Sequence, residues 1–190
     1  MQENSDLLYR IAKAFDDSAR CFRRENAALA ALECGKSIPQ MAPFQPLCDG
    51  VWCAHEEGAG TQAGLVAQGP GKGVQIDMHD IGTSRWFSLS WAIDRETLAS
   101  GRYFGLLAHT LSDGLTAWRP CLRYLFDNGS FQDVFCREHM VCSGGIAEEL
   151  GFIHIDPART KQARATEIHL FFTGARFRIT FLSLENLLII

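Results

Sequence analysis

The sequence predicts a mainly β protein, in which an antiparallel β-sandwich over residues 74–190 follows one long N-terminal α-helix. The first observation behind this prediction is a strict alternation between Arg85 and Asp94, a pattern of period two that is typical of a half-buried strand. Its apolar face consists of Phe87, Leu89, Trp91 and Ile93. The second observation is that short runs of the same kind recur to the end of the chain, separated by turn residues and without a helical period.

Composition excludes some classes of protein. The 190 residues carry 18 Lys and Arg against 22 Asp and Glu, and this net charge of -4, without a long basic cluster, argues against a nucleic-acid binder. No run is apolar enough to cross a bilayer, and the first residues lack the pattern of a signal peptide. Seven cysteines at irregular spacing suit a reducing compartment. We therefore expect a cytoplasmic location.

The first element in order is a helix over residues 6–34, which contain no Gly or Pro and end at Gly35. Asn4 or Ser5 can cap its start. Its heptad positions are occupied by Leu8, Phe15, Phe22 and Leu29, with Leu7, Ala14, Cys21 and Ala28 beside them. One interpretation is an oligomerisation arm (residues 1–35) that joins protomers in a coiled coil or bundle. The alternative is an amphipathic helix packed against its own domain; the heptads favour the homo-oligomer.

Residues 36–73 hold most of the prolines and many of the glycines, which predicts a largely irregular linker with a short strand at 64–68. Residues 69–73, Gly-Pro-Gly-Lys-Gly, lack the Ser or Thr and the following helix of a phosphate-binding loop. Cys48, Cys53 and His55 are possible metal ligands, but a structural zinc site requires a second close pair, so buried or idle thiols are the favoured interpretation.

From residue 74 onward the chain alternates between strands and turns. Asp127-Asn128-Gly129 is a hairpin signal, and Ser112-Asp113-Gly114 predicts a turn that ends a strand. A short helix is a candidate at 146–150. The predicted strands are 74–78, 85–94, 103–111, 118–126, 131–136, 140–142, 151–155, 167–173 and 176–190.

The order of these elements resembles the jelly-roll β-sandwich of carbohydrate-binding modules and galactose-binding-like domains. The similar features are the aromatic-rich stretch from Trp86 to Ile93 that leads to a Tyr-Phe strand, a hairpin near the middle, and a long last strand from Phe177. This resemblance of pattern covers about three-fifths of the chain. It implies a jelly-roll that binds sugars without catalysis. Because ligand sites vary in position within these families, the resemblance assigns no residue.

Alternation also predicts which side chains leave the core. If the polar faces belong to one sheet, they form a surface on which aromatic planes contact sugar rings and charged groups bind hydroxyls. The ligand-binding residues predicted in this way are Trp86, Arg123, His154, Asp156, His169 and Arg178. The alternative is a solvated outer face with scattered charges.

Function at this level is a hypothesis with three forms. The leading form is a non-catalytic carbohydrate-binding module with a carbohydrate or glycosylated partner, and the second is a structural or protein-interaction β-sandwich. The third is a metal-dependent enzyme, for which His154-x-Asp156 and Asp77-x-His79-Asp80 are candidate ligands. No cofactor is expected, although a loop aspartate such as Asp113 could hold a structural calcium ion. The usual hydrolase motifs are absent, whereas a Cys–His pair is visible only in three dimensions.

Overall fold

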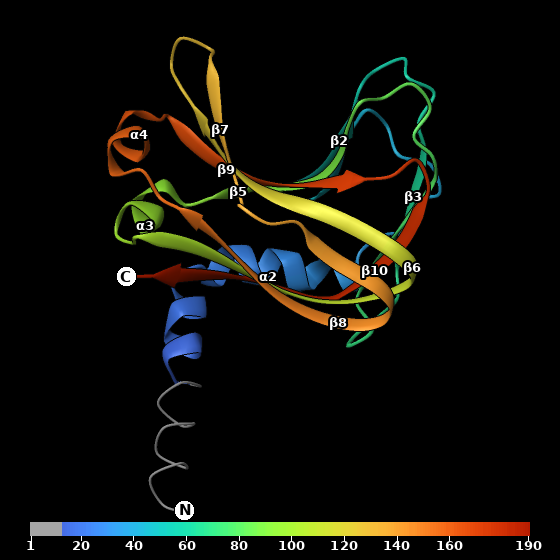
Figure 1. Cartoon of the computed structure of the whole chain (residues 1–190), viewed down its shortest axis with the longest axis horizontal. Helices are drawn as coiled ribbons and strands as arrows, with labels where there is room; N and C mark the ends of the chain where they lie inside the picture. Colours follow the sequence, from blue (N-terminus) through green and yellow to red (C-terminus); the bar gives the residue numbers. More distant parts are fainter. Residues whose placement is uncertain (1–12) are drawn as a thin grey trace, which may run out of the picture.

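The computed structural model describes residues 13–190, and within them the chain forms one antiparallel ten-stranded sheet with short helices (Figure 1). The strands are β1 (Phe44–Cys48), β2 (Val51–His55), β3 (Gln62–Ala67), β4 (Val74–Asp80), β5 (Phe87–Ile93), β6 (Tyr103–Leu125), β7 (Phe131–Phe135), β8 (Met140–His154), β9 (Ala165–Thr173) and β10 (Phe177–Ile189). The helices are α2 (Arg23–Ala31), the 3₁₀ turn η1 (Leu32–Cys34), α3 (Arg95–Ala99) and α4 (Pro157–Gln162). None of the described helices is long and apolar enough to cross a membrane.

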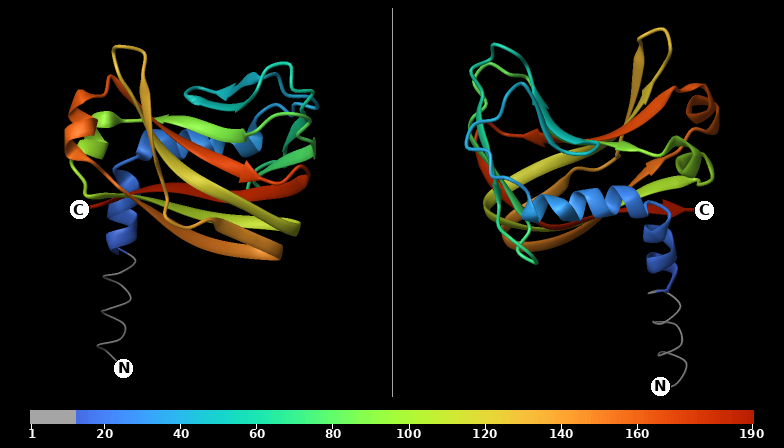
Figure 2. Two further views of the ribbon diagram at one scale, coloured as in Figure 1. Left: turned by 45° about the horizontal axis from the view of Figure 1, so that its top comes forward. Right: turned by 180° about the vertical axis from the view of Figure 1, so that it is seen from behind.

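The long strand β6 joins the two halves of the sheet. Residues 103–112 of β6 pair with β10 and β8, whereas residues 117–125 pair with β9 and β7. The strand order β1-β2-β5-β9-β6-β10-β4-β3 therefore continues through β6, and the sheet curls so that its halves face each other (Figure 2). The prediction of a mainly β, antiparallel fold is confirmed.

Aromatic side chains fill the space between the two halves. Phe172 on β9 stacks on Phe177 of β10 with ring centroids 4.9 Å apart, and Trp118 of β6 meets the edge of Phe181 at 5.8 Å. Phe87 lies against both Phe172 and Phe177. The four residues expected on the apolar face of the Arg85–Asp94 stretch are all buried in this core, as alternation predicted.

The prediction of a continuous helix over residues 6–34 is wrong for residues 13–34, the part of it that the structure describes. Residues 13–20 are helical, the helix breaks at 21–22, and α2 then runs in another direction (Figure 1). The cause is Phe22, whose backbone leaves the helical region (φ -111°, ψ 40°) while its ring is fully buried edge-to-face against Phe104. Burying this ring outweighs the hydrogen bonds that a continuous helix would keep. Residues 6–12 lie outside the described part.

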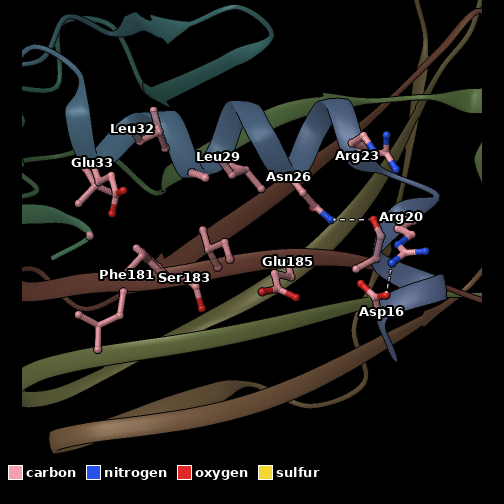
Figure 3. A pocket seen from close by; sticks show the side chains of 16 residues that line it. Asp16, Arg20, Arg23, Asn26, Leu29, Leu32, Glu33, Phe181, Ser183 and Glu185 are labelled. Atoms are coloured by element: carbon pink, nitrogen blue, oxygen red, sulfur yellow. Dashed lines mark hydrogen bonds and ion pairs between the residues drawn. The ribbon is translucent and has the colours of Figure 1, made fainter. Parts of the chain in front are cut away.

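A buried amide network fixes α2 on its own domain. The Asn26 side chain accepts a hydrogen bond from the Asn186 backbone N–H (2.8 Å) and donates to the Asn186 carbonyl (3.1 Å). Asn186 in turn accepts from the indole N–H of Trp91 at 3.0 Å. Figure 3 looks into the adjoining cavity of about 380 Å³ between α2 and β10, with Asn26 and Leu29 on the helix side. Of the two interpretations of the heptad residues, packing against its own domain therefore holds for α2.

The prediction of mostly irregular chain over residues 36–73 is wrong, because β1, β2 and β3 lie there. Pro46 is tolerated because β1 is an edge strand, which needs fewer of its N–H groups. The turn expected at 112–114 is instead a bulge that β6 passes through, and the helix expected at 146–150 is part of β8. Both errors arise where β8 pairs with β6, because this pairing extends along nearly the whole length of β8.

Candidate functional site

One outer side of the sheet carries a concentration of aromatic and polar side chains. It is the side opposite the core in the half made of β1, β2, β5, β9, the end of β6, and β7. In the ribbon the β1–β2 hairpin and β7 rise on either side of β5 and β9 (Figures 1 and 2). The members of this side, which we call the aromatic face, are Phe44, Trp52, Trp86, Ser88, Ser90, Arg119, Cys121, Arg123, Phe131, Asp133, Phe135, Glu167, His169 and Phe171.

Strand register places these residues next to one another. Directly opposed residues on neighbouring strands share a side of the sheet. Trp52 of β2 opposes Ser90 of β5, which opposes His169 of β9. His169 opposes Cys121 of β6, which opposes Phe135 of β7. Five strands thus contribute one transverse row, and its members are separated by up to 117 positions in the chain.

Aromatic contacts run across the face in an unbroken series. Phe44 lies 5.8 Å from Trp52, and Trp52 meets the edge of the His169 ring at 6.2 Å. His169 stacks on Phe171 at 5.6 Å, and Phe171 in turn contacts Phe135 (5.8 Å). Trp86 adds an edge-to-face contact with Phe171 at 6.3 Å. Phe44 and Phe135 remain 60% and 41% exposed, so the series ends in two apolar rings open to solvent.

His169 is held at the centre of the face by polar partners on both ring nitrogens. Its Nε2 lies 3.0 Å from a Glu167 carboxylate oxygen, and its Nδ1 lies 2.8 Å from the Ser90 hydroxyl. A carboxylate only accepts hydrogen bonds, so Nε2 carries a proton. The Ser90 hydroxyl is also hydrogen-bonded to the Ser88 hydroxyl at 3.0 Å. Ser90 is fully buried, so its oxygen is out of reach of a substrate, and the chain of hydrogen bonds serves to orient the imidazole.

Arg123 is neutralised by an acid on the same face. Its Nε and Nη2 donate to the two oxygens of Asp133 at 2.7 and 2.8 Å, a bidentate pair between β6 and β7. This hydrogen bonding raises the pKa of Arg123 above its usual value. The guanidinium also lies over the Phe131 ring, 4.2 Å from the centroid. Arg123 therefore supports Phe131 and offers little free charge to a ligand.

Cys121 neighbours His169 but is not an activated thiol. Burial raises the pKa of Cys121 to about 12, with the charge of Asp133 acting in the same direction. A thiol with this pKa stays protonated near neutrality and is a poor nucleophile. Within residues 13–190 no three His, Cys, Asp or Glu side chains gather in a way that could hold a metal ion. Cys53 and His55 point into the core, and Asp113 is paired with Arg178.

Three of the six predicted ligand-binding residues, Trp86, Arg123 and His169, come together on the aromatic face. The other three do not join them, so the prediction of a single surface requires correction. His154 on β8 contacts Tyr103 at the start of β6, and Arg178 on β10 pairs with Asp77 of β4, both in the other half of the sheet. Asp156 caps the N-terminus of α4 through the N–H groups of residues 158 and 159.

Sequence reasoning missed several members of the face: Phe44, Trp52, Arg119, Phe131, Asp133, Phe135 and Phe171. Two of them lie on β1 and β2, in the stretch expected to be irregular. Phe171 and Arg119 lie in predicted strands, where the alternation of side chains already places them opposite the core-facing residues. The missing information was the register, because a period of two assigns a side to each residue but does not identify its neighbour.

Comparison with solved structures identifies similar folds. A CBM22-1 xylan-binding domain from Paenibacillus barcinonensis matches with a TM-score of 0.50 and 11% identity, over 81% of this chain and 93% of that one. A family 11 carbohydrate-binding module from Clostridium thermocellum, in complex with a β-1,3-1,4-mixed-linked tetrasaccharide, matches with a TM-score of 0.50 and 11% identity, over 82% and 97%. A CBM4 structure matches with a TM-score of 0.51 and 13% identity, over 72% and 86%.

The sequence by itself matches neither a family model nor a curated protein. Similarity at 10 to 13% identity concerns the path of the backbone and assigns no activity. The predicted resemblance to a jelly-roll of this kind is nevertheless confirmed at the level of fold. The chain has a curled antiparallel β-sandwich fold like that of carbohydrate-binding modules.

Proposed function

We propose that the chain is a non-catalytic module that binds a carbohydrate chain on the aromatic face. The observation that carries this proposal is the series of aromatic rings from four strands, open to solvent at Phe44 and Phe135. The C–H face of a pyranose packs on such rings, and the charged groups between them bind hydroxyls. The curled backbone is shared with a xylan-binding domain and with a module bound to a β-1,3-1,4-mixed-linked tetrasaccharide, and this similarity supports a carbohydrate ligand.

A non-catalytic role is supported by the state of the reactive groups. The Ser90 hydroxyl is inaccessible, the Cys121 thiol has a raised pKa, and the carboxylates of Asp133 and Glu167 are each engaged by a basic side chain. A glycosidase requires two carboxyl groups free to act on a scissile bond. On this face the acids instead hold Arg123 and His169 in place.

The experiment compares two phenylalanines of matched exposure on opposite halves of the sheet. Phe135 on the aromatic face and Phe152 on β8 are 41% and 45% exposed. Binding of the native chain, Phe135→Ala and Phe152→Ala is measured by calorimetric titration with xylan, mixed-linked β-glucan and a panel of other polysaccharides. A sugar ring that covers about 50 Å² of Phe135 contributes about 1.3 kcal/mol, so its removal should weaken binding about eightfold.

Phe152→Ala should bind as the native chain does. The proposal fails if no polysaccharide binds, or if the two variants lose affinity equally. Circular dichroism of each variant establishes that the fold is intact, so that lost binding is not mistaken for unfolding.

A protein-interaction role is favoured by a different observation, on the outer side of β6 and β8. Exposed apolar side chains gather there: Leu111, Ile146, Leu150 and Phe152. A patch of this kind marks an interaction surface more often than a scattered set does. Loss of a protein partner in Phe152→Ala, with sugar binding unchanged, would assign this second role to the other half of the sheet.

Association of copies through residues 6–34 stays a prediction. Since Phe22 and Leu29 are buried in their own domain, it now depends on the residues before the break, such as Leu8 and Phe15. Light scattering of the full chain measures it, and a monomer mass at all concentrations would exclude it. A cytoplasmic location likewise stays a proposal, which fractionation of the source cells would test.

A further inference from the structure

Within residues 13–190, one cation on the aromatic face, Arg119, has no counter-ion. Arg119 on β6 opposes Phe171 of β9, and its guanidinium carbon lies 5.0 Å from the centroid of the Phe135 ring. Its Nε donates to the backbone carbonyl of Cys136 at 2.8 Å. Among residues 13–190 no carboxylate lies within ion-pair distance of this side chain, and no further hydrogen bond of its guanidinium is present.

A comparison with Arg123 shows which hydrogen-bond donors of Arg119 are unused. Both arginines project from β6 on the same side and both lie over a phenylalanine ring. Arg123 donates through Nε and Nη2 to Asp133. Arg119 uses one of the five N–H donors of a guanidinium and keeps both terminal nitrogens for another group. It is partly exposed, so these nitrogens are accessible at the edge of the aromatic series.

The acids of the face lie at its far end. Asp133 and Glu167 both oppose Arg123, four residues along β6 from Arg119. At about 3.3 Å per residue, the β6 positions of Arg123 and Arg119 are about 13 Å apart, which exceeds a Debye length of about 8 Å at physiological salt. Among the members of the aromatic face, the end that contains Phe171, Phe135 and Trp86 therefore carries the cation Arg119 and no acid, on a chain whose net charge is -4.

We propose that the aromatic face selects an anionic glycan, whose negatively charged substituent is bound by the free fork of Arg119 while the sugar ring packs on Phe135 or Phe171. This inference rests on the proposed carbohydrate-binding function. The terminal nitrogens of a guanidinium bind a carboxylate or a sulfate ester with two parallel hydrogen bonds. The shared chemistry is an anion attached to a pyranose, as in a uronic acid or a sulfated sugar.

The experiment uses two pairs of polymers that differ only in charge. One pair is polygalacturonate and the same polymer after carboxyl reduction, and the other is dextran sulfate and dextran. Affinity is measured by titration for the native chain and for Arg119→Gln, Arg119→Lys and Arg102→Gln. Arg102 is the matched control, because it is exposed and lies over the ring of Tyr103, 5.5 Å from its centroid, away from the aromatic face.

The native chain should prefer a charged polymer over its neutral parent by roughly tenfold to a hundredfold, the effect of one hydrogen-bonded charge. Arg119→Gln should abolish this preference, Arg119→Lys should retain part of it, and Arg102→Gln should retain all of it. Preference within the polygalacturonate pair alone identifies a carboxylate, and preference within the dextran pair alone identifies a sulfate ester.

Two results overturn the inference, and they are distinguishable. If charged and neutral polymers bind equally well, or if Arg119→Gln keeps the preference, selection of an anion by Arg119 is excluded while carbohydrate binding stands. If neither these polymers nor the neutral panel binds, the proposed function fails and the inference fails with it.

Discussion

Replacing Asn186 with leucine tests the account of how α2 is held. The side chain of Asn186 is fully buried in β10, where it accepts from the Trp91 indole N–H at 3.0 Å and donates to the Asn26 side chain at 2.7 Å. Leucine has the same number of side-chain heavy atoms with the same branching, so no large cavity results. The substitution removes two hydrogen bonds worth about 1 kcal/mol each and leaves the buried Trp91 N–H without a partner, at a further cost of about 1 kcal/mol or more.

The expected loss in the free energy of unfolding is therefore about 3 kcal/mol. With an m-value of about 2 kcal/mol per molar urea, this lowers the midpoint of urea unfolding by about 1.5 M without changing m. Unfolding followed by circular dichroism measures the shift. The control is Gln132→Leu, an exposed position on β7, which should change stability by less than about 0.5 kcal/mol.

A double-mutant cycle separates the network from the individual residues. Asn26→Ala alone removes the same helix contact, so the double variant Asn26→Ala, Asn186→Leu should lose less than the sum of the two single losses. Additive losses, or a loss below about 0.5 kcal/mol in Asn186→Leu, would refute the reasoning that a coupled amide network anchors α2.

Two further predictions concern the loops and the short helices. Gly73 has φ +80°, and a Cβ there would collide with the Phe181 carbonyl oxygen, whereas Gly58 has φ +72° and open space around it. Gly73→Ala should therefore cost clearly more in thermal unfolding than the roughly 1 kcal/mol of Gly58→Ala, and equal costs would contradict this steric contact. Asp94 caps α3 by accepting from the Thr97 N–H, and hydrogen bonding to the Thr97 side chain and N–H lowers the pKa of Asp94 below its usual value. A carboxyl group whose pKa is lowered by folding stabilises the folded state above its unfolded-state pKa, and this stabilisation is lost as the pH falls through its folded-state pKa. Asp94→Ala should therefore cost about 1 kcal/mol at pH 7 and progressively less below about pH 4. A cost that does not change with pH would show that the charge of Asp94 has no part in the cap.

The strands that have one side facing the core were predictable, because the alternation of apolar and polar residues is a local property of the chain. In β5 each apolar residue from Phe87 to Ile93 is separated from the next by one small or polar residue, and hydrophobic burial then decides which side faces inward. The same argument predicted β9, β10 and the second part of β6. It also placed Trp86, Arg123 and His169 on the outer side, before any neighbour was known.

Helix and strand limits were less predictable where distant contacts decide them. The heptads of residues 6–34 are compatible with one helix, and nothing local in the sequence marks Phe22 as a break. The break follows from burial of its ring against Phe104 and from the hydrogen bonds of Asn26 to β10, 160 positions further along. Likewise, pairing with β6 keeps residues 146–150 extended although their local pattern permits a helix.

The sequence by itself determined the class of fold and the side of the sheet to which most side chains belong, since both depend on spacing along one strand. Only the tertiary structure decided that Trp52, Ser90, His169, Cys121 and Phe135 form one row. It also decided that Asp133 neutralises Arg123, whereas no acid of the described part of the chain pairs with Arg119. The physical reason is that strand pairing is non-local: the register depends on how the whole core packs, and a shift of one residue would exchange the two sides.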